Sequence, residues 1–251
     1  MKIFVIVLVL LASIPVCSQT VKVAAAANLR FVFEEIKTAY ESANPNEKIS
    51  VNFGSSGALF QQILNGADFD IFMSADNSYP AKLKENGSFS GELQIYALGK
   101  LVLWSNTLDV SYGLKVLEES AVKHIVVAKP ELAPYGDRAL ECLKNAGLFE
   151  KIKHKIIYAD NISQTAQFAQ TGNAEVAFLA MSLTLTPEMK GSVFIPDPKS
   201  YKPIEQSMLL LKTRNENTTA EKFMKFILSE KCKTIFARKG YFVTGKQTHF
   251  D

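Results

Sequence analysis

Short apolar runs alternate along the chain with segments in which apolar residues recur every three or four positions. The runs have the length and β-branched content of buried strands, and the recurring spacing is that of helices. Their alternation is typical of an α/β fold with a largely parallel sheet. Strands are predicted over 21–25, 49–53, 69–74, 100–104, 124–128, 156–159, 175–179, 192–195 and 207–211, and helices over 29–43, 135–146, 164–170 and 220–237, with another carrying Leu59, Ile63 and Leu64.

No internal repeat or flexible linker divides the chain cleanly. The best connector candidates are the segment 96–100 and the Pro-rich stretch 196–203. If the chain forms two lobes, it would cross between them at these two places. That predicts a discontinuous first lobe, residues 19–98 and 205–251, around a continuous second lobe, residues 99–204.

The first 18 residues have the pattern of a secretory signal peptide. Lys2 precedes an apolar run over 3–12, which is too short to span a bilayer comfortably, and small residues follow it. The alternatives are a membrane anchor or a buried strand. Lipidation at Cys17 fits less well, because Val16 is not the small residue expected before a lipid-modified cysteine. We therefore expect an exported, periplasmic protein.

Composition and charge exclude several classes of protein. The 251 residues are 47% apolar and 21% charged, enough for a sizeable core. Lys and Arg total 28 against 25 Asp and Glu, and the resulting charge of +3 is spread along the chain, so no nucleic-acid partner is expected. With 13 Gly, 9 Pro and 3 Cys, the chain is not collagen-like, of low complexity or disulfide-dense.

Two cysteines, Cys142 and Cys232, remain after removal of the signal. Both fall on predicted helices, and sequence alone does not place their Cα atoms within bridging distance. We expect two unpaired cysteines, with a disulfide between them as the alternative in an oxidising compartment. The histidines and cysteines show no metal-ligand spacing, and no phosphate-binding loop or dinucleotide motif is present. No protein-bound metal or cofactor is predicted.

Four strand-to-helix junctions contain small or neutral polar residues and no Lys or Arg. Helices begin with free N–H groups, which attract anions, although capping alone explains any single junction. In open α/β sheets, ligands gather outside the carboxyl ends of the strands. Together the junctions predict a site for a small oxyanion held by neutral donors. They are Ala26-Ala27-Asn28, Gly54-Ser55-Ser56-Gly57, Ala133-Pro134-Tyr135-Gly136 and Asp160-Asn161-Ile162-Ser163.

Between Val21 and Phe242 the chain resembles the substrate-binding proteins of molybdate ABC transporters, which are type II periplasmic binding proteins. That resemblance implies two α/β lobes that close on a tetrahedral oxyanion and deliver it to an inner-membrane permease. The segments that carry it are Ala24-Ala25-Ala26-Ala27-Asn28-Leu29, Phe53-Gly54-Ser55-Ser56-Gly57-Ala58-Leu59, Phe69-Asp70-Ile71-Phe72-Met73-Ser74-Ala75-Asp76, Pro134-Tyr135-Gly136, Asn161-Ile162-Ser163-Gln164-Thr165 and Ile235-Phe236-Ala237-Arg238-Lys239-Gly240-Tyr241.

The resemblance also implies the binding residues. Asn28 and Ser56 would supply side-chain and backbone donors from the first lobe, and Tyr135 and Ile162 would supply backbone N–H groups from the second. Many relatives have Ser at the position of Asn28, and some have a Tyr ligand near Ala180, where this chain has no Tyr. This departure leaves the choice between molybdate and tungstate open. The implied protein is a monomer that needs no cofactor.

The same residues leave three alternatives to a molybdate carrier. Ser56 lies between glycines but lacks the G-x-S-x-G spacing of a nucleophile elbow, and nothing brings His124, His154 or His249 to it, so we expect no enzyme. A secreted serine hydrolase remains the less favoured reading. Trp104 and the tyrosines could stack on a sugar, but they do not cluster at the junctions. Sulfate or phosphate could replace molybdate in the same fold.

Overall fold

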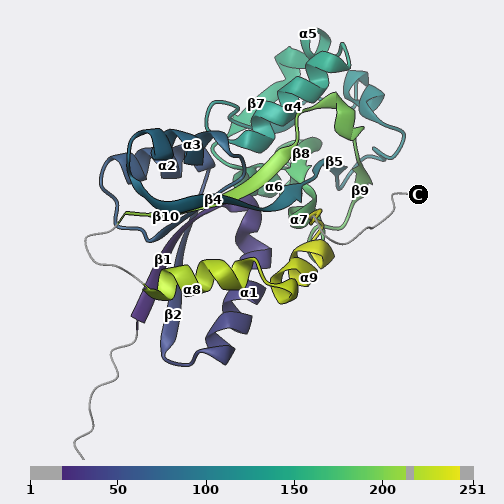
Figure 1. Cartoon of the computed structure of the whole chain (residues 1–251). Helices are drawn as coiled ribbons and strands as arrows, with labels where there is room; N and C mark the ends of the chain where they lie inside the picture. Colours follow the sequence, from purple (N-terminus) through teal and green to yellow (C-terminus); the bar gives the residue numbers. More distant parts are fainter. Residues whose placement is uncertain (1–18, 213–217, 244–251) are drawn as a thin grey trace, which may run out of the picture.

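A computed structural model describes residues 19–212 and 218–243 of the chain (Figure 1). The predicted signal peptide over 1–18, with Cys17, lies outside the described residues, and so does His249. Within the described residues, no helix is both long and apolar enough to cross a membrane.

The first lobe is built on a five-stranded sheet in the order β2-β1-β3-β10-β4. Strand β1 pairs in parallel with β2 and β3, whereas β10 runs antiparallel to both β3 and β4. Its strands are β1 (Gln19–Ala26), β2 (Glu47–Gly54), β3 (Ile71–Ser74), β4 (Phe89–Gly99) and β10 (Ile204–Leu211), and its helices are η1 (Ala27–Leu29), α1 (Arg30–Ala43), α2 (Ser56–Leu64), α3 (Ser78–Glu85), α8 (Thr218–Ile227) and α9 (Glu230–Arg238).

The second lobe has its own five-stranded sheet, in the order β7-β6-β8-β5-β9. Strand β6 is parallel to β7 and β8, and β5 is antiparallel to β8 and β9. Its elements are β5 (Leu101–Ser105), η2 (Leu114–Glu118), β6 (Ile125–Ala128), α4 (Pro134–Asn145), α5 (Phe149–Ile152), η3 (Lys153–Lys155), β7 (Ile156–Ala159), α6 (Ile162–Gln170), β8 (Val176–Ala180), α7 (Met181–Thr184), β9 (Ser192–Phe194) and η4 (Pro198–Ser200).

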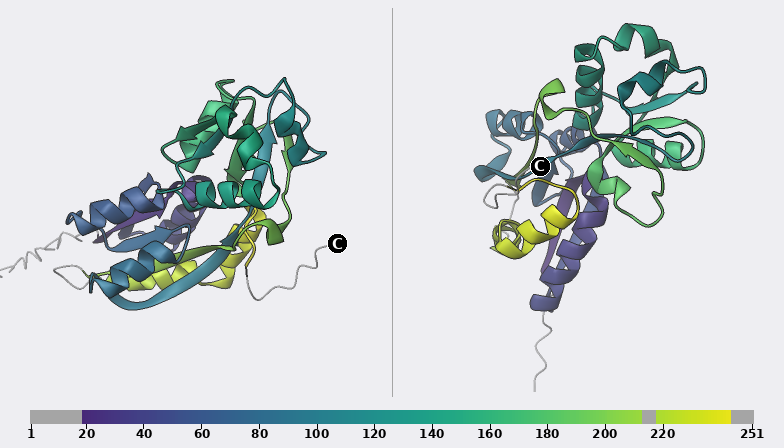
Figure 2. Two further views of the ribbon diagram at one scale, coloured as in Figure 1. Left: turned by 90° about the horizontal axis from the view of Figure 1, so that it is seen from above. Right: turned by 90° about the vertical axis from the view of Figure 1, so that its right-hand side faces the viewer.

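The views in Figure 2 show the two groups of elements as two lobes. The chain leaves the first sheet after Gly99 and enters the second at Leu101, and it returns to the first sheet at Ile204. The α/β fold and its two-lobed form are therefore confirmed. The expectation of largely parallel sheets is wrong, because β10 and β5 run against their neighbours and make both sheets mixed.

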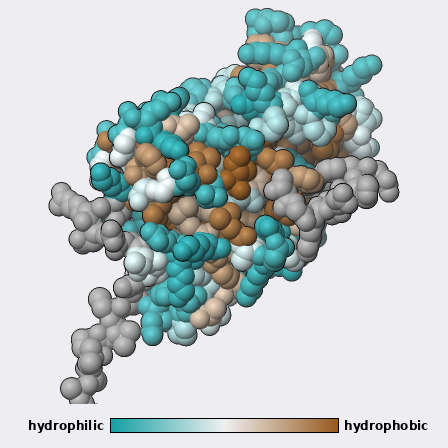
Figure 3. Space-filling model, in the orientation of Figure 1, coloured by the Kyte–Doolittle hydropathy of each residue, from teal (hydrophilic) through white to brown (hydrophobic). Residues whose placement is uncertain are grey.

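Each lobe has its own apolar core. Helix α1 buries Val32, Phe33, Ile36 and Tyr40 against the first sheet, and burying a large apolar side chain contributes about 1.5–3 kcal/mol. Three alanines at the ends of first-lobe strands belong instead to the apolar cluster of the second lobe: Ala26, Ala27 and Ala75. These small side chains let the two lobes approach closely. On the face in Figure 3, apolar residues gather near the middle of the molecule, and hydrophilic ones cover its outer parts.

The closing helix predicted over 220–237 is wrong as one element. The structure has two helices there, because Ser229 interrupts the first and caps the second. The Ser229 side chain accepts a hydrogen bond from the N–H of Cys232 at 3.4 Å. Both Cys142 and Cys232 are buried and unpaired, as predicted.

Candidate functional site

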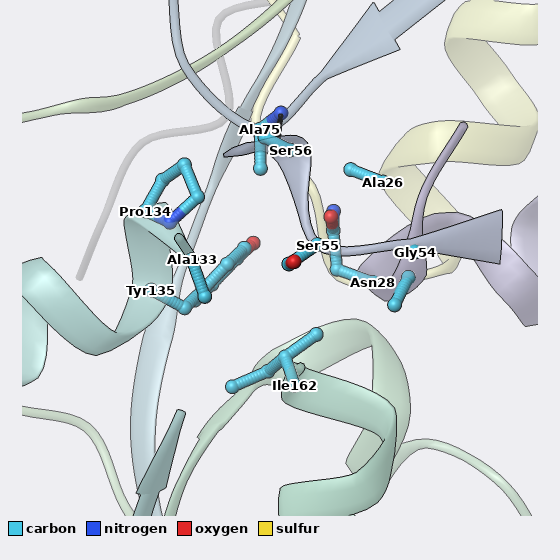
Figure 4. A pocket seen from close by; sticks show the side chains of 11 residues that line it. Ala26, Asn28, Gly54, Ser55, Ser56, Ala75, Ala133, Pro134, Tyr135 and Ile162 are labelled. Carbon is cyan, nitrogen blue, oxygen red and sulfur yellow. Dashed lines mark hydrogen bonds between the residues drawn. The ribbon is translucent and has the colours of Figure 1, made fainter. Parts of the chain in front are cut away.

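A small pocket lies between the two lobes, where the carboxyl ends of several strands meet (Figure 4). At most about 210 Å³ inside it is free of protein atoms, less than the roughly 300–1,000 Å³ of pockets for larger organic ligands. The pocket therefore suits a small ion. Its lining is Ala26, Ala27, Asn28, Gly54, Ser55, Ser56, Ala75, Ala133, Pro134, Tyr135 and Ile162.

All four residues named from the sequence line this pocket. Asn28 and Ser56 come from the first lobe, and Tyr135 and Ile162 come from the second. They lie 27 to 134 positions apart in sequence, and the fold brings them together because each follows a strand whose carboxyl end points to the cleft. The structure thus places the predicted residues at one site.

Three helices present their first turns to the pocket. Ser56 opens α2, Tyr135 is the second residue of α4, and Ile162 opens α6. An α-helix offers no internal partner to the N–H groups of its first turn. Pro134 contributes no N–H and presets the backbone at the start of α4. The pocket is therefore bordered by backbone donors and by the positive ends of helix dipoles.

The Ser56 hydroxyl is held in place by the backbone of the same lobe. Its Oγ accepts a hydrogen bond from the N–H of Ala75 at 3.0 Å. A hydroxyl carries one donor in addition to its acceptor lone pairs. This contact leaves the hydroxyl proton of Ser56 available to a ligand.

Tyr135 places its ring in the hinge between the lobes. A Cβ on Gly99 would lie 2.1 Å from the Tyr135 hydroxyl oxygen and 3.0 Å from Nε2 of Gln206, so the phenol packs against both crossover strands. Burial raises the pKa of Tyr135 well above its usual value, which keeps the phenol neutral. The ring supports the hinge, and the backbone N–H of Tyr135 is at the start of α4.

Asn28 is held by a buried network that no pattern in the sequence predicts. Its Nδ2 donates to Oε1 of Gln206 at 2.8 Å and to the hydroxyl of Tyr241 at 2.9 Å. The Tyr241 hydroxyl also lies 3.1 Å from Oγ of Ser182, two residues beyond Ala180. The predicted strand began at 207 and excluded Gln206. The one signal in the sequence that could have pointed to Gln206 is its position beside Ser207, where two polar residues precede an apolar strand.

Direct hydrogen bonds between the lobes close the structure around the pocket. On the α2 side, the N–H of Gly57 donates to the carbonyl of Leu132 at 2.8 Å, and the Tyr79 hydroxyl donates to the carbonyl of Glu131 at 2.7 Å. On the α6 side, Oγ of Ser163 donates to the carbonyl of Ala27 at 3.0 Å.

Charged groups are absent from the residues that line the pocket. None is Lys, Arg, His, Asp or Glu, so an anion there would be held by neutral donors alone. Among residues 19–212 and 218–243, no cluster of three or more His, Cys, Asp and Glu side chains could hold a metal ion.

The described histidines are not part of the site. The His124 side chain is more than half exposed and lies 4.0 Å from a carboxylate oxygen of Glu175. His154 is exposed in η3 at the outer edge of the second lobe. Neither lines the pocket with Ser56. Neither of these two described histidines could therefore serve as the base of a serine nucleophile there.

Comparisons with known proteins agree with this architecture. The profile of the family described as bacterial extracellular solute-binding protein matches residues 21–242. The molybdate-binding protein ModA of Azotobacter vinelandii is 36% identical over 225 residues, covering 88% of this chain and 89% of that protein. ModA of Rhodobacter capsulatus is 34% identical over 235 residues, covering 93% and 92%.

A solved structure supports the same assignment. The periplasmic molybdate-binding protein of Azotobacter vinelandii superposes with a TM-score of 0.84 at 32% identity, covering 89% of this chain and 99% of that one. The sequence match and the structural match cover similar shares of this chain, 88% and 89%. The chain therefore belongs to the bacterial extracellular solute-binding protein family.

Proposed function

We propose that this protein captures molybdate, or the isostructural tungstate, in the pocket between its lobes and delivers it to the permease of an ABC transporter. One observation carries the proposal: a small buried pocket between two lobes, bordered by helix N-termini and neutral side chains, without acid or base. The relatives named for molybdate binding support this choice of oxyanion.

The ligand is bound by donors from both lobes. The N–H groups of Ser56, Tyr135 and Ile162 and the hydroxyl of Ser56 point to the oxyanion, and Asn28 completes the first-lobe side. Hydrogen bonds to a charged partner contribute about 1.5–3 kcal/mol each, and an isolated buried anion is very costly to desolvate. Several donors must therefore act together, and they do so only when both lobes are in contact with the ion.

A pocket that offers hydrogen-bond donors and no acceptors selects for a deprotonated ligand. Hydrogen phosphate carries an O–H group that would face N–H groups and find nothing to accept it. Sulfate is fully deprotonated, so it must be rejected by its size, because a cage closed on a larger ion leaves long contacts to a smaller one.

Binding shifts an equilibrium between open and closed lobes, and the closed form is the one delivered to the permease. The protein acts in the periplasm as a monomer. It is a carrier and not an enzyme, and it needs no cofactor because the molybdenum arrives as the oxyanion itself.

Titration calorimetry at neutral pH on the chain without residues 1–18 tests this proposal, with molybdate, tungstate, sulfate and phosphate in parallel. We expect tight one-to-one binding of molybdate and tungstate and no heat from the other two. Strong sulfate or phosphate binding without a molybdate signal would keep the carrier and change its ligand. Silence with all four anions would reject an oxyanion carrier and reopen the sugar-binding and hydrolase alternatives.

A further inference from the structure

The Asn28 carboxamide is buried with its oxygen unpartnered. The side chain lines the pocket, and Figure 4 shows it reaching between Ser56 and Ala26. Both N–H groups of Nδ2 are used inside the protein, by Gln206 and Tyr241. Oδ1 has no hydrogen-bond partner in the described structure.

An unpartnered acceptor is unfavourable at this place for two reasons. A buried polar atom without a hydrogen bond destabilises the protein, since it has lost its water. A carboxamide oxygen also carries partial negative charge, and it would repel an oxyanion in the pocket. The orientation in the structure therefore suits neither the buried side chain nor the proposed ligand.

A half-turn of two carboxamides gives Oδ1 of Asn28 a donor and turns Nδ2 of Asn28 to the pocket. If Asn28 and Gln206 rotate together, Nε2 of Gln206 donates to Oδ1 of Asn28, and Nδ2 of Asn28 takes the place now held by Oδ1. Gln206 gives up two long contacts of Nε2, 3.5 Å to the carbonyl of Ala75 and 3.4 Å to that of Ile204, and its Oε1 then faces these carbonyls. Binding of the oxyanion must supply the free energy for this placement, so the exchange is coupled to the ligand.

Tyr241 can follow the same exchange. Its hydroxyl now accepts from Nδ2 of Asn28 and lies 2.9 Å from the Asn28 carbonyl oxygen. After the rotation it donates to Oδ1 of Asn28, and the Asn28 carbonyl keeps Oγ of Ser182 as its donor at 3.0 Å. Burial raises the pKa of Tyr241 well above its usual value, so the phenol retains the proton it must donate.

From these contacts we infer that Gln206 is a specificity-determining residue, which turns the Asn28 carboxamide so that it donates to a deprotonated oxyanion. The inference rests on the proposed function. Gln206 is fully buried in β10 and is not among the residues that line the pocket, so it acts through Asn28 as a positioning residue. In the orientation seen in the structure, Asn28 and Gln206 would instead present Oδ1 of Asn28 as an acceptor to a protonated anion.

Two substitutions of Gln206 separate positioning from packing. Gln206→Glu keeps the shape but has no N–H to give, so it holds Nδ2 of Asn28 away from the pocket. Gln206→Met fills the space and leaves Asn28 free to turn toward Tyr241. We expect the Glu variant to lose about tenfold to 150-fold in molybdate affinity and the Met variant less than about threefold.

A double-mutant cycle separates positioning from simple charge repulsion. In an Asn28→Ser background no carboxamide remains to be turned, so adding Gln206→Glu should change affinity by less than about threefold. A loss that persists in that background would show that the new charge repels the ligand directly, and would overturn the inference. Equal losses in the Glu and Met variants, or none in the Glu variant, would also overturn it.

Side-chain NMR provides a readout that does not depend on affinity. In ¹⁵N-labelled wild-type protein, molybdate should shift the Asn28 carboxamide resonances, and in the Gln206→Glu variant at saturating ligand it should not. Unshifted wild-type resonances with bound molybdate would refute the inference while the proposed function stands. A wild-type protein that binds no molybdate would instead refute the proposed function. Thermal melting of each ligand-free variant checks that it folds.

Discussion

Gly57 lies where the two lobes touch beside the pocket, and it has no room for a side chain. A Cβ at this position would lie 2.9 Å from Cα of Leu132, 3.0 Å from its carbonyl oxygen and 2.6 Å from the Tyr79 hydroxyl. Two of these atoms are backbone of the opposite lobe and cannot rotate away. We therefore predict that Gly57→Ala keeps the lobes from closing fully.

The expected loss follows from the contacts that closure makes there. Separating the lobes by a few tenths of an ångström weakens the hydrogen bonds from Gly57 to Leu132 and from Tyr79 to Glu131. Each neutral hydrogen bond contributes about 0.5–1.5 kcal/mol, so the closed form loses about 1–3 kcal/mol. Ligand affinity should fall about fivefold to 150-fold, because binding must now supply that difference.

The first lobe itself should not lose stability. Gly57 is a helical residue outside the left-handed backbone region, and Ala is favoured over Gly inside helices by about 0.5–1 kcal/mol. The ligand-free variant should melt at the wild-type temperature or above it. Weaker binding in an equally stable protein distinguishes blocked closure from damage to the fold.

Calorimetry with molybdate and small-angle scattering with and without ligand measure the two effects. The Gly57→Ala variant should stay more extended than wild type at saturating ligand. Tyr79→Phe removes one interlobe hydrogen bond without a clash and should cost about twofold to tenfold. Its matched control is Tyr112→Phe, whose hydroxyl bonds to Glu119 within the second lobe. Wild-type affinity and compaction in Gly57→Ala would refute the reasoning.

Three further outcomes are expected. Ser56→Ala should weaken molybdate binding about tenfold to 150-fold by calorimetry, with the exposed Ser90→Ala as control, and unchanged affinity would remove Ser56 from the site. Tyr135→Phe should cost less than about threefold, since the backbone N–H remains, and a large loss would show that the hydroxyl binds. Burial raises the pKa of Cys232 to about 11, so mass spectrometry should find this thiol unalkylated at pH 8 until denaturant is added; rapid native labelling would contradict its burial.

Local rules predicted the four strand-to-helix junctions around the pocket, and the family resemblance implied which residue of each junction binds. Asn28, Ser56, Tyr135 and Ile162 each follow a strand and open or precede a helix, and an α/β sheet gathers such positions at one edge. The absence of Lys and Arg from these junctions also indicated neutral donors. That these junctions meet at one site could therefore be predicted from short segments, each only a few residues long.

Other parts of the fold could not be read in this way. Strand β4 escaped prediction because its residues do not alternate between apolar and polar, and its pairing with β10 joins segments more than 100 positions apart. In the sequence, Gly57 is only one glycine of a strand-to-helix junction. Its role in lobe closure is visible only in the structure, where the backbone of Leu132 lies against it. Gln206 and Tyr241 reach Asn28 from 178 and 213 positions away.

A pocket without charged side chains makes these distant contacts decisive. The attraction of a Lys or Arg falls off slowly with distance and tolerates misplacement, whereas a hydrogen bond weakens steeply once its length or angle departs from ideal. With neutral donors only, affinity depends on each donor's placement. Gly57 sets how closely the second lobe approaches, and Gln206 sets which atom of Asn28 faces the ion. Residues that do not line the pocket, or that only set the approach of the lobes, should therefore control affinity as strongly as Ser56, for which direct contact is proposed.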